Sequence, residues 1–253
     1  MRLPILLLAV ILLSGRPASH SPAFRSGAAA PSSSTGFAVV ELFTSEGCSS
    51  CPPADEALAR LAGKYPDNVF VLAWHVDYWD RLGWKDIYST ADYTRRQQEY
   101  SRRFNLESVY TPEAVINGKK EFVGSDDNQL QATVKEELDA TANSSLGLTT
   151  TSLSSHIIQV KFALTKAPTG ATIQIALVQS KVSSQVLAGE NQGMRLRHVN
   201  VVRDWQSTPA SPAGQVSLKI PTGLTAKDYQ VIAFLQNKDG HISAAEKIAT
   251  PGF

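Results

Sequence analysis

The pattern of hydrophobic and polar residues changes near residue 143. Before this point, apolar runs of strand length alternate with segments whose apolar residues recur at helical spacing. After it, short runs alternate apolar and polar residues between turn-forming residues, and no long helical segment occurs. The pattern predicts an α/β domain over residues 37–143 followed by an all-β sandwich over residues 144–253.

A strand, a helix and a second strand open the first domain. Residues 37–43 are apolar and β-branched apart from Glu41, which is typical of a strand buried on both faces. A helical stripe begins at Pro52, and residues 69–76 return to strand character. This spacing predicts a β-α-β unit with parallel strands and a right-handed crossover.

The rest of the first domain predicts a helix, a hairpin and a final helix. Residues 90–104 have a helical pattern. Asn117-Gly118 between two apolar runs indicates a two-residue hairpin turn, because both central residues of a type I′ turn need positive φ. Asp126, with Gln129 three residues later, predicts the N-cap of the final helix.

Short alternating runs in the second domain predict six strands. They are residues 157–162, 172–178, 198–202, 216–220, 229–235 and 242–248. The third run carries His198 and Asn200 and follows the sequence GENQG at residues 189–193. So much polarity on one strand face predicts a contact with the first domain, a second site or an ordinary exposed face.

The first residues have the pattern of an export signal. One basic residue precedes an apolar run that is too short for a bilayer core of about 30 Å. Residues 1–22 therefore predict a signal peptide, with an uncleaved anchor as the alternative, and residues 23–36 have linker composition. We expect an exported protein, periplasmic or extracellular, with no stable membrane span after signal cleavage.

Composition argues against nucleic acid as a partner. The chain has 24 Lys and Arg against 23 Asp and Glu, a formal net charge of +1, so no global field attracts a polyanion. Four arginines, at positions 95, 96, 102 and 103, lie on the predicted helix 90–104. We interpret them as a solvated helix face.

The chain has two cysteines, Cys48 and Cys51, in a CxxC pattern between the first strand and the first helix. In the oxidising compartment that export implies, such a pair forms a disulfide. A thiol at a helix start lies at the positive end of the helix dipole, which favours the thiolate by about 0.3 to 1 kcal/mol. Cys48 is thus the candidate attacking thiol and Cys51 the resolving thiol.

The residues next to the cysteines limit this stabilisation of the thiolate. Ser49 and Ser50 contribute hydroxyl groups without charge, and the carboxylate of Glu46 opposes ionisation. Pro52-Pro53 after the second cysteine indicates that the regular helix begins only there, since proline suits the first helical turn. We expect a moderately favoured thiolate and a middling redox potential.

These features together resemble the thioredoxin superfamily over roughly residues 37–142, and the second half is most similar to glutaredoxins. The motifs that carry the resemblance are Cys48–Cys51, Thr111-Pro112, Asn117-Gly118 and Gly124–Asp127. The longer strings ELFTSEGCSSCPPADEAL, HVDYWDRLGWKD, YTPEAVING and GENQGMRLRHVNVVR resemble an uncharacterised family of exported thioredoxin-like proteins with a C-terminal β-sandwich. The fold class that this implies is a thioredoxin-like domain followed by an all-β sandwich.

The resemblance also implies site residues. Thr111 and Pro112 would form a cis peptide bond whose backbone faces the cysteines and binds an extended substrate. Glu41 would be the buried proton acceptor for Cys51. It lies seven residues before Cys48, one more than is usual, so a bulge or an extra loop residue must correct the register. No cofactor is implied.

Three functions fit these residues. The first is a thiol-disulfide oxidoreductase acting on cysteine-containing protein or peptide clients, together with a redox partner. The second is Cu(I) handling by the paired thiolates, with help from His75 at the end of the second predicted strand. The third is a structural disulfide in a non-catalytic binding protein. His75, Ser49 and Ser50 are the candidate neighbours that support the cysteines, and packing of His75 among aromatic residues is the plainer alternative.

Overall fold

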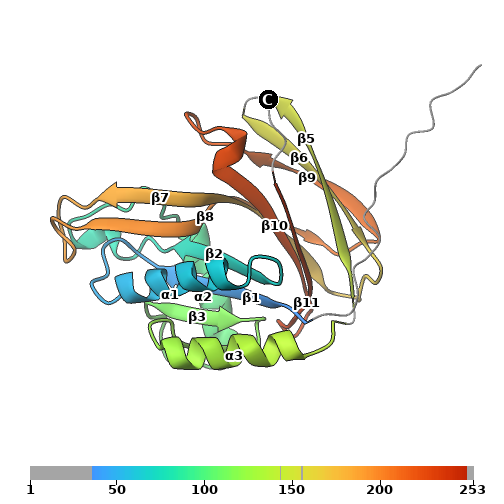
Figure 1. Cartoon of the computed structure of the whole chain (residues 1–253), viewed down its shortest axis with the longest axis horizontal. Coiled ribbons are helices and arrows are strands. Elements are labelled where there is room, and N and C mark those ends of the chain that lie inside the picture. The colour runs from blue at the N-terminus through green and yellow to red at the C-terminus, as the bar shows by residue number, and fades with distance from the viewer. Residues whose placement is uncertain (1–35, 143, 155, 250–253) are drawn as a thin grey trace, which may run out of the picture.

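The computed structural model describes residues 36–142, 144–154 and 156–249. The predicted signal peptide, and the predicted linker up to residue 35, lie outside these ranges. The fold is mixed α/β and mostly β, with a large sheet and a second, smaller sheet (Figure 1). In the described part of the chain, every helix is too short or too polar to cross a membrane.

The first half forms helices and strands in the predicted order. They are β1 (Ala38–Thr44), α1 (Pro52–Lys64), β2 (Val69–His75), the short 3₁₀ helix η1 (Asp80–Leu82), α2 (Ala91–Phe104), β3 (Glu113–Ile116), β4 (Lys120–Val123) and α3 (Asp127–Asp139). Asn117 and Gly118 have φ of 47° and 62°, as the type I′ turn requires. The Asp126 side chain accepts a hydrogen bond from the backbone N–H of Gln129, which confirms the predicted cap.

The second half is almost entirely strand. Its elements are β5 (Leu146–Ser154), β6 (Ile157–Leu164), β7 (Thr172–Gln185), β8 (Arg195–Pro209), β9 (Ala213–Lys219), the 3₁₀ helix η2 (Ala226–Asp228), β10 (Tyr229–Gln236) and β11 (Ile242–Ala249). All six predicted strands are present. Sequence analysis missed β5, which is rich in threonine and serine, and it underestimated the lengths of β7 and β8.

The two halves share one sheet. Its strand order is β11-β10-β7-β8-β2-β1-β3-β4, and β5-β6-β9 form the smaller sheet. β1 and β2 pair in parallel, as the β-α-β pattern predicts. The parallel pairing of β8 with β2, at Val201 and Ala73, joins the halves. The predicted division into an α/β domain and a self-contained sandwich is therefore not confirmed.

Buried apolar residues in the described ranges form three cores. The first lies between the large sheet and helices α1 and α3, and includes Leu58 and Leu130. The second lies on the opposite face under α2, and includes Tyr100 of α2 and Phe234 of β10. The third fills the space between the smaller sheet and β7 and β10. Because the second core contains residues from both halves, apolar packing also holds the halves together.

The β7–β8 hairpin returns the second half of the chain to α1. In Figure 1 the hairpin extends beyond the smaller sheet and runs along β2 and α1. Residues 186–194 connect the two strands, and we call them the β7–β8 turn. This turn contacts the loop between β1 and α1 that carries both cysteines.

Candidate functional site

Cys48 and Cys51 form a disulfide in the loop between β1 and α1. Cys51 is the N-cap residue of α1, so the cysteines lie in the turn before the regular helix, as Pro52-Pro53 predicted. The cysteines are 0% and 1% exposed, whereas Ser49 and Ser50 between them are exposed. Both cysteines are therefore covered in this conformation, although the attacking role predicted for Cys48 needs an accessible sulfur atom.

The β7–β8 turn contacts the loop that carries the disulfide. The side-chain N–H₂ of Asn191 donates to the backbone oxygens of Glu46 and Cys48, both at 2.9 Å. The neighbouring Glu190 carboxylate accepts a hydrogen bond from the backbone N–H of Ser49 at 3.0 Å. The GENQG sequence thus contacts the first half of the chain. Such a contact was one of the three alternatives that the sequence analysis left open for this region.

The Thr111–Pro112 segment lies beside the disulfide. Its peptide bond is cis, as predicted. The Ser50 hydroxyl is 3.3 Å from the Cys48 sulfur and donates to the backbone oxygen of Thr111 at 3.5 Å. Trp79, from the loop after β2, donates to the Thr111 hydroxyl at 2.8 Å. Three other predicted site residues, Cys48, Cys51 and Ser50, therefore lie next to Thr111 and Pro112.

Glu41 does not lie beside the cysteines, and the role predicted for it is wrong. Side chains alternate along β1, so Leu42 packs toward α1 while Glu41 faces α2. There Glu41 binds Arg96 through two hydrogen bonds of 2.5 and 2.8 Å and also accepts one from Tyr100. β1 pairs with β2 without a register shift, so no bulge turns the carboxylate toward Cys51.

The same contact corrects the interpretation of the arginines on α2. Arg95, Arg102 and Arg103 are exposed, as a solvated face requires. Arg96 is buried and forms an ion pair with Glu41. The sequence of α2 alone does not indicate that the ion-pair partner of one of its arginines lies in the core.

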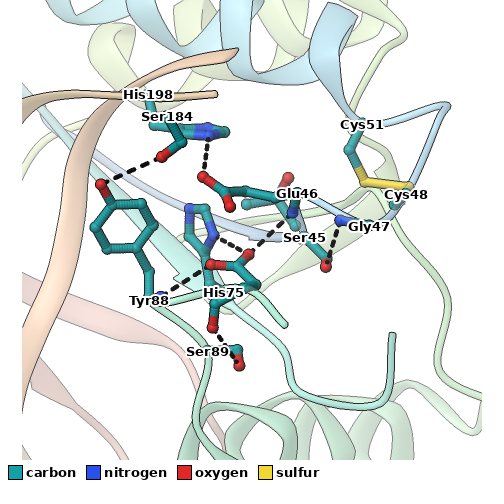
Figure 2. Close-up of polar contacts among 12 residues, drawn as sticks. Ser45, Glu46, Gly47, Cys48, Cys51, His75, Tyr88, Ser89, Ser184 and His198 are labelled. Carbon is teal, nitrogen blue, oxygen red and sulfur yellow. Dashed lines mark hydrogen bonds and ion pairs between the residues drawn. A yellow bond between two sulfur atoms is a disulfide. The ribbon is translucent and has the colours of Figure 1, made fainter. Parts of the chain in front are cut away.

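A buried group of two histidines and three carboxylates lies next to the disulfide loop (Figure 2). Its members are at most 4% exposed, and they are Glu46, Asp55, His75, Asp86 and His198. His75 Nδ1 is 2.6 Å from Asp86 Oδ2, and this carboxylate also accepts the backbone N–H of Glu46 at 2.9 Å. Burial raises the pKa of Asp86, but the charge and hydrogen bond of His75 lower it more, so the net shift is downward.

His198 connects both flanks of the CxxC turn. Its Nδ1 is 3.2 Å from Asp55 Oδ1, and its Nε2 is 3.6 Å from Glu46 Oε1. Burial lowers the pKa of His198, but Asp55 and Glu46 raise it to about 10. Burial likewise opposes the charge of Glu46, yet hydrogen bonds from His198, Ser184 and Trp84 bring the pKa of this carboxyl below its ordinary value.

Sequence analysis missed two of the five members of this group. His75 was expected near the cysteines and Glu46 was expected to oppose the thiolate, but Asp55 and Asp86 were not singled out. The spacing of Asp55 was an available signal, because residues four apart on a helix lie on one side of it, and Asp55 follows Cys51 by four. The partner of Asp55 comes from β8 and has no local signal.

Comparison with known proteins places the chain in a family. A protein-family profile described as "Protein of unknown function (DUF1223)" matches residues 39–236. The chain belongs to the DUF1223 family. The match runs from β1 to β10, so the matched region includes both halves and the β7–β8 turn.

Two solved structures resemble this DUF1223 protein over most of its length. The protein AGR_C_4864 from Agrobacterium tumefaciens is 28% identical, with a TM-score of 0.62, and the alignment covers 87% of this chain and 97% of that one. HBP35 of Porphyromonas gingivalis is 17% identical, with a TM-score of 0.58 and coverage of 86% and 76%, which shows a similar fold. No curated protein sequence matches the chain.

The residues named for the copper alternative are engaged otherwise in this structure. The cysteines are joined in the disulfide, and His75 Nδ1 is bound to Asp86. Within the described ranges, no three His, Cys, Asp or Glu side chains are grouped so as to hold a metal ion.

Another buried carboxyl group, that of Glu113, directly follows Pro112. Glu113 is fully buried, and its Oε2 accepts a hydrogen bond of 2.7 Å from the side chain of Gln97. The same amide donates to the backbone oxygen of Tyr110 at 2.6 Å, so Gln97 links both ends of the Thr111–Pro112 segment. Burial raises the pKa of Glu113 to about 7.

Glu113→Gln is expected to change the pH dependence of stability. The raised pKa means that the native protein loses stability as pH rises from about 4.5 to about 7, where Glu113 must ionise in the fold. Glutamine removes this loss, so the variant should gain up to about 3 kcal/mol relative to the parent between pH 5 and pH 8. Urea unfolding at several pH values measures it, with exposed Glu136→Gln as the control. If the free energies of unfolding of Glu113→Gln and the parent change with pH in parallel, the raised pKa of Glu113 is contradicted.

Proposed function

We propose that this protein is an exported thiol-disulfide oxidoreductase that acts on cysteine-containing protein or peptide clients through Cys48 and Cys51. The observation that carries the proposal is the position of the disulfide, in the turn before α1 and next to Thr111–Pro112. A CxxC turn at a helix start is the setting in which one cysteine is attacked and the other leaves as a thiolate.

The arrangement of the first half supports this proposal. The strands run in the order β2-β1-β3-β4, with α1 and α3 packed on one face and α2 on the other. We propose that this arrangement is a thioredoxin-like domain formed by residues 37–143. Residues 144–253 would then add strands on the β2 side and a second sheet. The signal pattern of residues 1–22 and the disulfide support export to an oxidising compartment.

The proposed reaction begins from the disulfide form. A client thiolate attacks the Cys48 sulfur, the Cys48–Cys51 bond breaks, and Cys51 leaves as a thiolate that takes up a proton. A second client thiolate then attacks the mixed disulfide, so the client gains a disulfide and Cys48 leaves as a thiolate that is protonated. The client has lost two electrons to the protein, and a redox partner with its own disulfide accepts them. The reverse sequence reduces a client.

Burial of the sulfur atoms sets a condition on this chemistry. An attacking thiolate must approach along the axis of the bond that breaks, and the covered Cys48 sulfur offers no such approach. A segment packed on this loop must therefore move when a client binds, and we propose that it is the β7–β8 turn. Such a movement breaks the hydrogen bonds that Asn191 donates to the disulfide loop and the one that Glu190 accepts from it.

The proposed function is tested by trapping clients. Cys51→Ser leaves Cys48 able to form a mixed disulfide but unable to resolve it, so covalent adducts should accumulate in the compartment where the protein resides. Non-reducing gels followed by mass spectrometry identify the adducts and the linked cysteine. The double variant with Cys48→Ser is the matched control. If Cys51→Ser traps no more protein than the double variant, the oxidoreductase proposal is wrong.

A second candidate function is favoured by the burial of the sulfurs. In it, the chain is a non-catalytic binding protein and the Cys48–Cys51 bond is structural. Structural disulfides resist reduction in the folded protein. Full resistance of the bond to dithiothreitol under native conditions would support this candidate, and reduction without unfolding supports the oxidoreductase.

A further inference from the structure

His198 is the single described residue that faces carboxylates on both sides of the CxxC turn. Glu46 comes from the loop two residues before Cys48, and Asp55 comes from α1, four residues after Cys51. Figure 2 shows the Glu46 side chain between the His198 ring and the loop that carries the disulfide. His198 of β8 thus lies beside the CxxC turn, from which it is distant in the sequence.

The contacts of the His198 ring indicate which of its nitrogens carry a proton. Each ring nitrogen of His198 lies opposite a carboxylate oxygen, at 3.2 Å for Asp55 and 3.6 Å for Glu46. A neutral imidazole has one donor and one acceptor nitrogen, and a lone pair facing a carboxylate would be repelled. The imidazolium has a proton on each nitrogen and a positive charge, so it fits an ion pair with each carboxylate. The upward shift of the pKa of His198, to about 10, agrees with this geometry.

We propose that His198 is a positioning residue for the cysteine chemistry: its positive charge compensates Glu46 and Asp55 and thereby allows a thiolate to form in the reduced CxxC turn at neutral pH. The inference rests on the proposed thiol chemistry of Cys48 and Cys51. It changes the expectation from sequence, in which the carboxylate before the cysteines simply opposed ionisation.

Other charged groups around the turn do not replace His198. The His75 ring packs against that of His198, with the ring centres 4.8 Å apart, and its Nδ1 is bound to Asp86. Glu190 on the β7–β8 turn is exposed to solvent, where water screens its charge. Tyr88 contributes a ring that faces His198, and Arg203 lies over that ring, 4.9 Å from its centre. Without the imidazolium, two buried carboxylates would remain beside the cysteines with no facing cation.

The test measures the ionisation of the reduced, full mature chain. The ultraviolet absorbance of the thiolate is followed against pH in the parent protein and in His198→Gln. Loss of one buried positive charge should reduce the thiolate fraction at pH 7 by about tenfold. In the double variant Glu46→Gln/His198→Gln one negative charge is also removed, so the fraction should recover toward the parent value.

Two further variants make the result interpretable. His75→Gln removes the other buried histidine but leaves both flanking carboxylates compensated, so it should change the thiolate fraction much less than His198→Gln. Glu46→Gln alone should increase the fraction several-fold, and it remains informative if His198→Gln does not fold. An unchanged fraction in folded His198→Gln, no increase in Glu46→Gln, or an equal decrease in His75→Gln would each overturn the inference.

This experiment separates the inference from the proposed function. Thiolate absorbance is measured without a client, so it can shift as expected in a protein that traps no client. In that case the compensation by His198 stands and the oxidoreductase proposal fails. Conversely, trapped clients together with an unchanged thiolate fraction would leave the oxidoreductase proposal intact and overturn the role of His198.

Discussion

Replacing Arg96 with methionine is expected to lower the free energy of unfolding by about 3 to 5 kcal/mol, because the Glu41 carboxylate would remain buried without its cation. Glu41 is fully buried on β1, and Arg96 is 2% exposed on α2. The remaining donor to Glu41 is the hydroxyl of Tyr100, which does not carry a compensating charge. Urea unfolding measures the loss, and the melting temperature should fall with it.

A double variant distinguishes loss of charge compensation from loss of packing. Arg96 also lies over the rings of Trp74 and Phe234, at 5.1 and 5.4 Å from their centres, so methionine removes some of these contacts. Glu41→Leu combined with Arg96→Met removes both charges and should recover most of the stability, since apolar pairs often replace buried ion pairs without loss. If the double variant is as unstable as Arg96→Met, packing and not charge explains the effect.

Asn191→Ala is expected to accelerate reduction of the disulfide by dithiothreitol by about five- to 150-fold. The Asn191 side chain makes two hydrogen bonds, to the backbone oxygens of Glu46 and Cys48, and both are buried. Without these bonds, the closed position of the β7–β8 turn should be less stable relative to the open position by about 1 to 3 kcal/mol. The fraction of molecules with an open turn, and with it the rate of reduction, rises accordingly. The measurement is the rate of thiol release from the folded protein at low denaturant.

Glu190→Gln is the matched control for this prediction. Glu190 is the adjacent residue of the same turn, but its bond to the backbone of Ser49 is exposed and should contribute little. Its rate should stay within a few-fold of the parent rate. Equal rates in Asn191→Ala and the parent would show that the turn does not control access to the disulfide.

Local interactions explain what could be predicted from the sequence. The Asn117-Gly118 turn and the Asp126 cap depend on residues within a few positions of each other, and both are found as predicted. The cis bond before Pro112 and the start of α1 at Pro52 were also correct. In the second half, alternation identified six strands but missed β5, whose threonines and serines carry little hydrophobic contrast.

The errors concern contacts between distant segments. Glu41 was assigned by its distance from Cys48 along the chain, but the alternation of β1 turns it to the opposite face, toward Arg96. Arg96 itself was placed on a solvated face for the same reason, since its partner is on another element. His198 faces Asp55 only because β8 joins the sheet beside β2, and no sequence pattern specified that junction.

The junction between β2 and β8 has a consequence for synthesis of the chain. While the nascent protein emerges, β1 to β4 are complete long before β8 exists, so the outer edge of β2 has no neighbour. An unpaired edge strand readily pairs with other chains. The first half therefore depends on β8 of the second half to cover this edge and limit aggregation.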